Sequence, residues 1–218
     1  MSMQQRDLRE ALVQTYAEMI RRGLNQGTAG NCSVRCPQAN RFLVTPSGMP
    51  LEAMTPDAMV LMDTGGDVVG EGKPSSEWRF HRDILQARPD VGAVVHTHSV
   101  AATALACVRQ GIPAFHYMVA VAGGADIRCA PYALFGTQEL SNAALEALEN
   151  RKACLMANHG VIALGNDLNQ ALNLAQEVET LAQQYLASKQ FGEPVLLSQA
   201  QMQQVFEQFR DYGYKKTS

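Results

Sequence analysis

The sequence predicts one α/β domain over residues 1–218, with a central, largely antiparallel sheet flanked by helices on both faces. Strand-like and helix-like segments are intermixed along the chain, which favours a layered α/β arrangement. The strand-like segments are short, and no internal repeat, low-complexity tract or linker divides the 218 residues. A chain of this length can bury a core without disulfides or structural metals.

Apolar spacing and turn residues define the elements in the first half of the chain. Leu8, Leu12 and Tyr16 lie four residues apart and give a helix an apolar face that ends at Gly23. The stretch 25–31 contains two Gly and two Asn and is expected to be a loop. Short strands are expected at 32–35, 42–45 and 58–62, followed by a hairpin turn at 64–67 that leads to 68–69.

The second half continues the alternation of helices and strands. Ser75 is expected to cap a helix that carries Glu77 and His81 and ends near Pro89. Further strands are expected at 92–98, 127–132, 153–156 and 161–164. Further helices are expected at 100–109, from the cap Thr137 to 150, at 167–190, and after a capping box formed by Ser198 and Gln201.

Composition and charge exclude several classes of protein. Hydrophobic residues make up 46% and charged residues 18% of the chain, the balance of a globular protein rather than of a disordered or collagen-like one. The net charge is −3 and no more than two basic residues are adjacent. Neither a nucleic-acid partner nor an anionic membrane surface is therefore expected.

The start of the chain and its cysteines favour a cytoplasmic protein with reduced thiols. Residues 1–12 carry charges where a signal peptide needs an apolar core, and no apolar run approaches the roughly 20 residues of a membrane span. The five cysteines include no C-x-x-C pair. Cys32 and Cys36 lack a second matching pair, so we interpret them as residues of a strand rather than metal ligands.

The histidines supply the strongest functional signal. His96 and His98 stand at the end of an apolar strand, where residues i and i+2 point to the same side, about 6–7 Å apart along the strand. His159 follows another apolar strand. Three imidazoles on one metal ion leave a coordination position open, which is the pattern of catalytic zinc.

The other two histidines are less informative. His81 follows Glu77 by four residues on the same helix face. The sequence leaves open whether His81 is a metal ligand, a hydrogen-bond partner or a surface residue. His116 precedes Tyr117 and is interpreted as structural.

Three turns rich in small residues suit a phosphate group. The segment 73–77 places Ser75 and Ser76 at a helix start, beside free N–H groups and the positive end of the helix dipole. The turns 27–31 and 45–48 add backbone that can approach an anion closely. The chain lacks the GxxxxGK[ST] motif of an NTPase, so a smaller phosphorylated substrate is expected beside the metal.

Taken in order, these motifs resemble the class II aldolase family. The resemblance runs nearly end to end and rests on GTAGNCSVR at 27–35, TPSG at 45–48, SSE at 75–77, HTH at 96–98 and NHG at 158–160. Within the family, the segments 23–27, 75–81, 116–118 and 129–133 are most similar to the branch that acts on L-fuculose 1-phosphate. The resemblance implies the class II aldolase fold and a homotetramer with four-fold symmetry and active sites at subunit interfaces.

The resemblance also implies roles for the residues around the metal. One Zn²⁺ per chain would be held by His96, His98 and His159. Glu77 would be the acid/base and would take the fourth zinc position when substrate is absent. Tyr117 would reach into the neighbouring subunit's site as a proton donor.

The two ends of the substrate would be bound by different groups. The phosphate would be held by residues of the three small-residue turns, namely Gly30, Asn31, Ser47, Gly48, Ser75 and Ser76. The aldehyde end would be lined by Phe135 and by Tyr212 near the C-terminus.

The implied reaction is the zinc-dependent cleavage of a ketose 1-phosphate to dihydroxyacetone phosphate and a short aldehyde. L-fuculose 1-phosphate, which gives L-lactaldehyde, is the best-matched substrate. The metal would act as a Lewis acid that stabilises an enediolate, and Glu77 would move the C3 proton. Thr97, Ser99, Asn158 and Ser47 depart from the fuculose prototype; they leave the ligands intact but bear on the preferred aldehyde.

Other activities on the same fold are the alternatives. An L-ribulose-5-phosphate 4-epimerase needs an additional Asp and His, for which the chain shows no clear match. A 3-oxo-tetronate 4-phosphate decarboxylase replaces the second Ser of the phosphate turn with Lys, whereas Ser76 is present here. A methylthioribulose-1-phosphate dehydratase would keep the three histidines. A non-catalytic adducin-like scaffold would have lost the ligands, and all of them are present.

Overall fold

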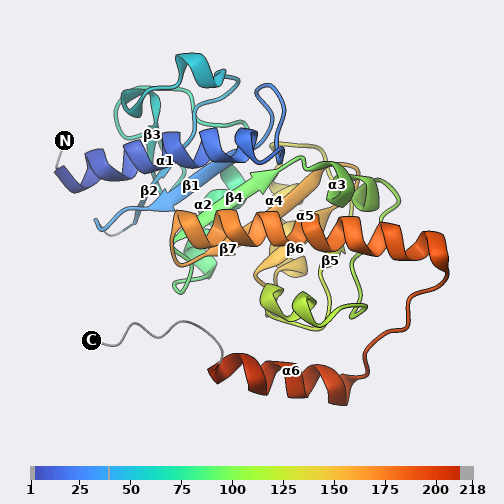
Figure 1. Ribbon diagram of the computed structural model, residues 1–218. Helices are drawn as coiled ribbons and strands as arrows, with labels where there is room; N and C mark the ends of the chain where they lie inside the picture. Colours follow the sequence, from blue (N-terminus) through green and yellow to red (C-terminus); the bar gives the residue numbers. More distant parts are fainter. Residues whose placement is uncertain (1–2, 39, 212–218) are drawn as a thin grey trace.

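A seven-stranded sheet runs through the middle of the computed structural model, which describes residues 3–38 and 40–211 (Figure 1). The strand order is β3-β2-β1-β4-β7-β6-β5, and all neighbours are antiparallel except the edge pair β5 and β6. The strands are β1 (Asn31–Arg35), β2 (Arg41–Val44), β3 (Val60–Asp63), β4 (Ala93–Thr97), β5 (Arg128–Ala130), β6 (Ala153–Met156) and β7 (Gly160–Gly165). The predicted α/β class with a largely antiparallel sheet is confirmed.

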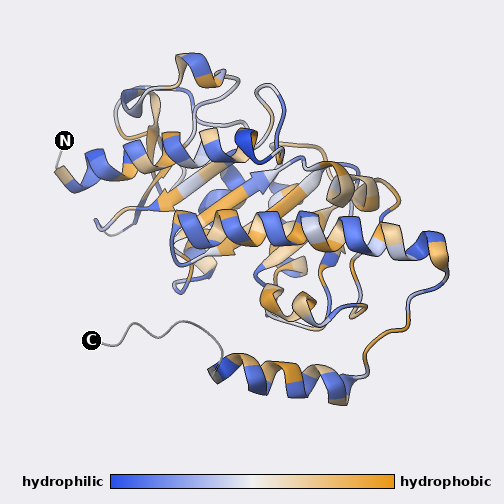
Figure 2. Ribbon diagram, in the orientation of Figure 1, coloured by the Kyte–Doolittle hydropathy of each residue, from blue (hydrophilic) through white to orange (hydrophobic). Residues whose placement is uncertain are grey.

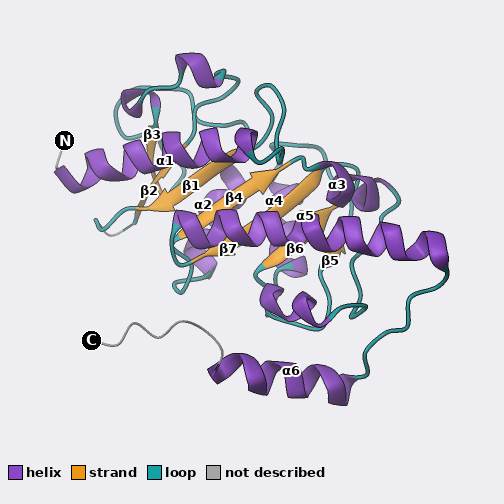
Figure 3. Cartoon of the chain, in the orientation of Figure 1, coloured by secondary structure: helices purple, strands orange, loops and turns teal. Residues whose placement is uncertain are grey.

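Helices cover both faces of this sheet, as the sequence predicts (Figure 3). α1, α3 and α5 pack on one face, and α2 and α4 pack on the other. The helices are α1 (Met3–Arg21), α2 (Trp78–Ala87), α3 (Val100–Cys107), α4 (Gln138–Ala147), α5 (Leu168–Phe191) and α6 (Gln199–Asp211). Among the described residues, no helix combines the length and apolar character that crossing a membrane requires.

Side chains alternate along the strands and form a separate core on each face of the sheet. On β4, Ala93 and Val95 pack beneath α1, α3 and α5, whereas Val94 packs beneath α2 and α4. Figure 2 shows the resulting hydrophobic strands between helices that carry both hydrophilic and hydrophobic bands. His96 is two residues after Val94 and so points to the same face of the sheet. Its ring centroid lies 5.5 Å from that of Phe80 on α2. The predicted metal ligand on β4 therefore faces α2.

Most predicted helix caps are present. The predicted cap Thr137 accepts a hydrogen bond from the N–H of Leu140. Asp167, which was predicted only as the start of its helix, also caps it by accepting a bond from the N–H of Gln170. Ser198 and Gln201 form the predicted capping box, with reciprocal bonds of 2.8 and 3.2 Å.

The predicted cap of α2 was wrong. Glu77, not Ser75, occupies the N-cap position, and it makes no side-chain cap bond. The N–H of Ser75 bonds to the carbonyl of Thr45, and Pro74 forms a β-bridge with Pro46. This pairing ties residues 74 and 75 to the turn at 45–46, and the helix begins three residues after Ser75, at Trp78.

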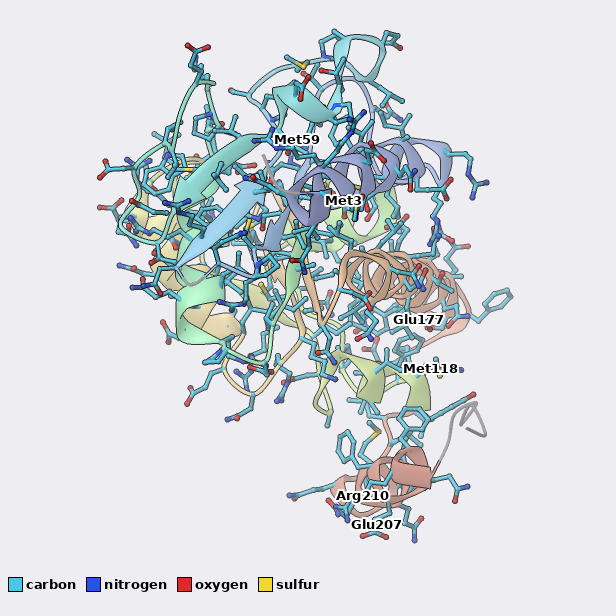
Figure 4. All side chains as sticks on the ribbon, turned by 90° about the vertical axis from the view of Figure 1, so that its left-hand side faces the viewer. Met3, Met59, Met118, Glu177, Glu207 and Arg210 are labelled. Atoms are coloured by element: carbon cyan, nitrogen blue, oxygen red, sulfur yellow. The ribbon has the colours of Figure 1, made fainter. Side chains whose placement is uncertain are left out.

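The C-terminal helix projects from the sheet domain. α6 contacts the chain mainly through η3 (Tyr117–Ala122), a six-residue 3₁₀ helix that the sequence did not predict. Met202 of α6 is buried there against Ala114 and Ala120. Figure 4, where Glu207 and Arg210 mark α6, shows this helix set apart from the rest of the chain. Two further short 3₁₀ helices, η1 (Leu51–Ala53) and η2 (Pro56–Ala58), precede β3.

Candidate active site

Strand pairing brings the three predicted ligand histidines together. β4 and β7 are antiparallel neighbours with Thr97 opposite Val161, so the end of β4 meets the start of β7. His96 is on β4, His98 follows it directly, and His159 immediately precedes β7. One ring nitrogen from each of the three lies within 4.8 Å of the others. The sequence prediction that these residues form one cluster agrees with this geometry.

The hydrogen bonds of His96 and His98 suit them to bind a cation. The Nδ1–H of His96 donates to the carbonyl of Val161 at 2.8 Å, which leaves Nε2 as the ring nitrogen that faces the cluster. The Nε2 atoms of His96 and His98 are 3.0 Å apart. Two lone pairs cannot face each other at this distance unless a proton or a cation lies between them. The donor set therefore fits a divalent metal.

Glu77 completes the cluster from the start of α2. Its Oε2 lies 3.1 Å from Nε2 of His96, and its Oε1 lies 3.1 Å from Nε2 of His159. Burial opposes the charged carboxylate, but the charge on His96 and hydrogen bonds from His159 and His96 outweigh burial. The pKa of Glu77 therefore lies well below its ordinary value. Glu77 is an ionised, buried carboxylate in contact with two of the three imidazoles.

The histidines of the cluster have different pKa values. Burial favours the neutral form of His96, but the Glu77 carboxylate favours the charged form and raises the pKa of His96. Burial, and then the charges of His96 and His159, lower the pKa of His98 to about 4. At neutral pH His98 is therefore a neutral imidazole, the form that binds metals.

An open pocket of about 300 Å³ lies in front of the cluster. All six predicted phosphate residues line it, together with Glu77, His98 and His159. Gly30 and Gly48 both have positive φ, at 72° and 63°. A Cβ on Gly30 would also overlap the side-chain amide of Asn25, so only glycine fits this wall.

The small-residue turns are joined by backbone hydrogen bonds. The N–H of Ser47 bonds to the carbonyl of Lys73 at 3.0 Å, and the N–H of Ser75 bonds to the carbonyl of Thr45 at 3.0 Å. The N–H of Thr45 bonds in turn to the carbonyl of Cys32 on β1. Three segments far apart in the sequence thus form one wall of the pocket.

Comparisons with known proteins decide the family. Residues 10–186 match the family model described as "Class II Aldolase and Adducin N-terminal domain". The chain belongs to the class II aldolase family.

Individual relatives agree with this membership. The chain is 53% identical to a 5-methylthioribulose-1-phosphate/5-deoxyribulose-1-phosphate aldolase of Rhodospirillum rubrum, over 94% of this chain and 92% of the relative. It is 49% identical to the L-fuculose phosphate aldolase of Escherichia coli K12, over 98% and 99%. A solved L-fuculose 1-phosphate aldolase superposes with a TM-score of 0.90 at 42% identity, covering 94% of this chain and 96% of that one. This class II aldolase is thus an enzyme with the fold of its family, whose members are generally metal dependent.

The residues predicted for the aldehyde side and for the subunit interface lie in separate places. Phe135 lines the pocket and is 62% exposed. Tyr117 is not among the pocket residues: it is half-exposed on η3, with its ring centroid 6.3 Å from that of Phe209 on α6. Its own chain therefore does not bring Tyr117 to the histidine cluster. Tyr212 lies outside the described residues.

Some pocket residues were missed by sequence reasoning. Tyr132 and Ala133 line the pocket beside Phe135, and the motif at 129–133 was the signal that could have identified them. Asn158, which the sequence marked as bearing on the preferred aldehyde, also lines the pocket, in the left-handed conformation with φ 56°. Asn25 accepts a hydrogen bond from the N–H of His98 at 2.9 Å, which ties the loop before β1 to a metal-ligand candidate.

The structure answers the questions about the remaining histidines. His116 accepts a hydrogen bond from the N–H of Met118 and caps η3, as expected of a structural residue. His81 is completely buried on α2 and bonds to Ser33 and Asn31. Burial, and then the charge on His96, lower the pKa of His81 to about 3, with Glu77 opposing. His81 is therefore a buried, neutral hydrogen-bond partner.

Proposed function

We propose that this class II aldolase is a zinc enzyme that cleaves a ketose 1-phosphate to dihydroxyacetone phosphate and a short aldehyde. The observation that carries the proposal is the position of Glu77. Its ionised carboxylate contacts two of the three clustered imidazoles and lines a pocket whose other wall is built from small-residue turns. Metal ligands, an acid/base and an anion-binding wall therefore share one cavity.

The phosphate end is assigned to the three joined turns. Ser47, Ser75 and Ser76 offer hydroxyl groups, and Gly30 and Gly48 let a ligand approach the backbone closely. Ser75 and Ser76 also lie just before Glu77, the N-cap of α2, and the N-terminal end of a helix favours negative charge.

The metal end is assigned to His96, His98 and His159, which would hold Zn²⁺, one ion per chain. When bound, the ion would supply Lewis-acid stabilisation of the negative charge that develops on the ketose oxygens as the C3–C4 bond breaks. The Nδ1–H bond from His96 to Val161 keeps the His96 ring oriented for this task.

The proton transfers are assigned to Glu77 and Tyr117. In the direction of bond formation, the ionised Glu77 carboxylate takes the C3 proton of dihydroxyacetone phosphate, and the electron pair left on C3 forms the bond to the aldehyde carbon. The aldehyde oxygen becomes the C4 hydroxyl by taking a proton from Tyr117 of a neighbouring subunit, and cleavage runs through the same steps in reverse. The exposed position of Tyr117 on η3 is compatible with such a shared site in a homotetramer.

The aldehyde end is expected to set the substrate. Phe135 and Tyr132 offer apolar, exposed surface at the pocket, and Tyr212 is proposed to complete it. L-fuculose 1-phosphate remains the leading candidate substrate. The 53% identity to an aldolase named for 5-methylthioribulose 1-phosphate and 5-deoxyribulose 1-phosphate favours these as the second candidates.

The deciding experiment is a cleavage assay on the purified protein. L-fuculose 1-phosphate, 5-deoxyribulose 1-phosphate and 5-methylthioribulose 1-phosphate are supplied separately, and dihydroxyacetone phosphate is detected with glycerol-phosphate dehydrogenase. We expect release of dihydroxyacetone phosphate that a chelator stops and zinc restores. Zinc-loaded protein that releases none of it from any of the three would contradict the cleavage proposal, and conversion of L-ribulose 5-phosphate would instead indicate an epimerase.

A glycine beside the cluster provides a further prediction. A Cβ on Gly160 would overlap the carbonyl oxygen of Thr97 and would lie 3.0 Å from Cδ2 of His98. We expect Gly160→Ala to displace the His98 ring and weaken zinc affinity by about 10–100-fold, the effect typical of residues that support metal ligands. Zinc affinity is measured by competition with a chelating dye.

Gly23→Ala is the control for this variant. Gly23 has φ 70° at the end of α1, with no atoms within 4 Å of the added methyl group. That variant should lose about 1 kcal/mol of stability through backbone strain and keep its zinc affinity. Unchanged zinc affinity in Gly160→Ala would contradict the prediction, because the added methyl group would then be accommodated without displacing the His98 ring.

A further inference from the structure

A buried line of hydrogen bonds ends on the carboxylate of Glu77. The Oγ of Ser33 lies 2.7 Å from Nδ1 of His81, and Nε2 of His81 lies 2.5 Å from Oδ1 of Asn31. The Nδ2 of Asn31 donates to Oε2 of Glu77 at 2.9 Å. His81 and Ser33 have no exposed surface, so water does not compete for these bonds.

The chemistry of the groups fixes the direction of every bond in this line. An ionised carboxylate only accepts hydrogen bonds, so the end of Asn31 that faces Glu77 must be its NH₂ group. The other end of Asn31 is then the carbonyl, which requires a proton on Nε2 of His81. A neutral ring with that proton has a lone pair on Nδ1, and the hydroxyl of Ser33 must donate to it.

Strand parity and helix spacing place these groups together. Asn31 and Ser33 are two residues apart on β1 and so face the same side of the sheet, which is the side that α2 covers. Asn31 lies directly opposite His96 in the β1–β4 register. His81 is one turn after Glu77 on the α2 segment. The line therefore links β1 and the start of α2 at the metal-ligand candidate.

We propose that His81 is a positioning residue for the acid/base: its Nε2–H holds the Asn31 amide in the single orientation that donates to Glu77. Without that N–H, the amide could rotate and turn its carbonyl towards the carboxylate, where two acceptors would repel. Glu77 would then lose the bond that fixes its Oε2 atom. This inference rests on the proposed role of Glu77 in moving the C3 proton.

Two substitutions of His81 separate its hydrogen bond to Asn31 from its bond to Ser33. The amide of Gln extends as far as the Nε2 position and can still donate to Asn31. The shorter amide of Asn ends near the Nδ1 position, so it meets Ser33 and fails to reach Asn31. The two residues are alike in polarity, and both place an uncharged amide in the same buried space.

The readout is exchange of the C3 proton of dihydroxyacetone phosphate with D₂O, catalysed by the zinc-loaded enzyme and followed by NMR. This half-reaction needs Glu77 and does not depend on the aldehyde. We expect H81N to lower the exchange rate constant by about 10–100-fold with KM nearly unchanged, and H81Q to stay within about threefold of wild type. Equal rates for H81N and H81Q would overturn the proposal.

A double-mutant cycle tests whether His81 acts through Asn31. In the Asn31→Ala background the amide is gone, so adding H81N should change the exchange rate by less than about twofold. If the double variant instead shows the product of the two single-mutant fold-changes in exchange rate, His81 acts through the general packing of α2. That result would overturn the proposal.

A neutron structure of the holoenzyme supplies a measurement independent of activity. We expect deuterium on Nε2 of His81, none on Nδ1, and the ND₂ group of Asn31 facing Glu77; any other arrangement overturns the proposal. The ketose cleavage assay keeps the two proposals apart. Wild-type enzyme that exchanges the C3 proton but cleaves no ketose phosphate would contradict the cleavage proposal and leave the His81 inference standing.

Discussion

Replacing Glu77 with Gln is expected to abolish turnover while zinc remains bound. The substitution preserves the shape of the side chain, but an amide cannot take up or deliver a proton at C3. A positioned acid/base contributes about 10²–10⁴-fold to a rate, so kcat should fall by at least that factor. The three imidazoles are untouched, so zinc content measured by plasma mass spectrometry should stay near that of wild type.

Glu10→Gln provides the matched control for this variant. The Glu10 carboxylate is exposed on α1 and pairs with Arg6 at 3.2 Å. Losing an exposed ion pair of this kind costs about 0–1 kcal/mol and should leave kcat unchanged. Full activity in Glu77→Gln would exclude Glu77 as the acid/base.

Changing His98 to Ala is expected to remove zinc and activity together. His98 follows β4 directly and supplies one of the three clustered nitrogens. Loss of one of three protein ligands should weaken zinc binding by more than the 10–100-fold typical of supporting residues. Dialysed protein should then contain little zinc and show no cleavage, whereas dialysed wild type keeps its ion.

Thermal unfolding separates this loss of zinc from a loss of fold. A ligand at about 1,000 times its Kd stabilises the native state by about 4.1 kcal/mol, so zinc should raise the Tm of wild type and not that of His98→Ala. The metal-free proteins should unfold at similar temperatures, since His98 lies at the pocket wall rather than in the core. A variant that holds zinc at full occupancy would contradict the assignment of His98 as a ligand.

Local sequence patterns were sufficient to predict the elements that carry the site. The apolar run before His96 and the β-branched run after His159 predicted β4 and β7, because a short continuous run of apolar residues is typical of a strand that is buried on both faces. The capping residues of α4 and α6 were also correct, because a cap depends only on its own turn. The three histidines were identified because each stands at the end of an apolar strand, whereas the pairing of β4 with β7 that brings them together is long-range.

Features that depend on long-range pairing could not be predicted. Ser75 was wrongly predicted to cap α2, because its backbone bonds to Thr45, a partner that no local pattern reveals. The bond from Asn31 to Glu77 depends on the β1–β4 register and on how α2 packs over it. The role of His81 was left open at the sequence level for this reason. The 3₁₀ helix at Tyr117 was missed because its small apolar residues carry no clear period.

The two ends of the pocket differ in how firmly the chain holds them. Asn31 and the turn at Thr45 are joined to the sheet by strand pairing and backbone hydrogen bonds. Tyr132 and Phe135 belong instead to the exposed connection between β5 and α4. Under the proposed function, changes in this connection would alter which aldehyde is accepted without disturbing the residues proposed to bind phosphate and metal. We therefore propose residues 131–136 as the place for a library selected for new carbon–carbon bond formation, since substitution at this one loop would change the substrate range and leave the proposed chemistry intact.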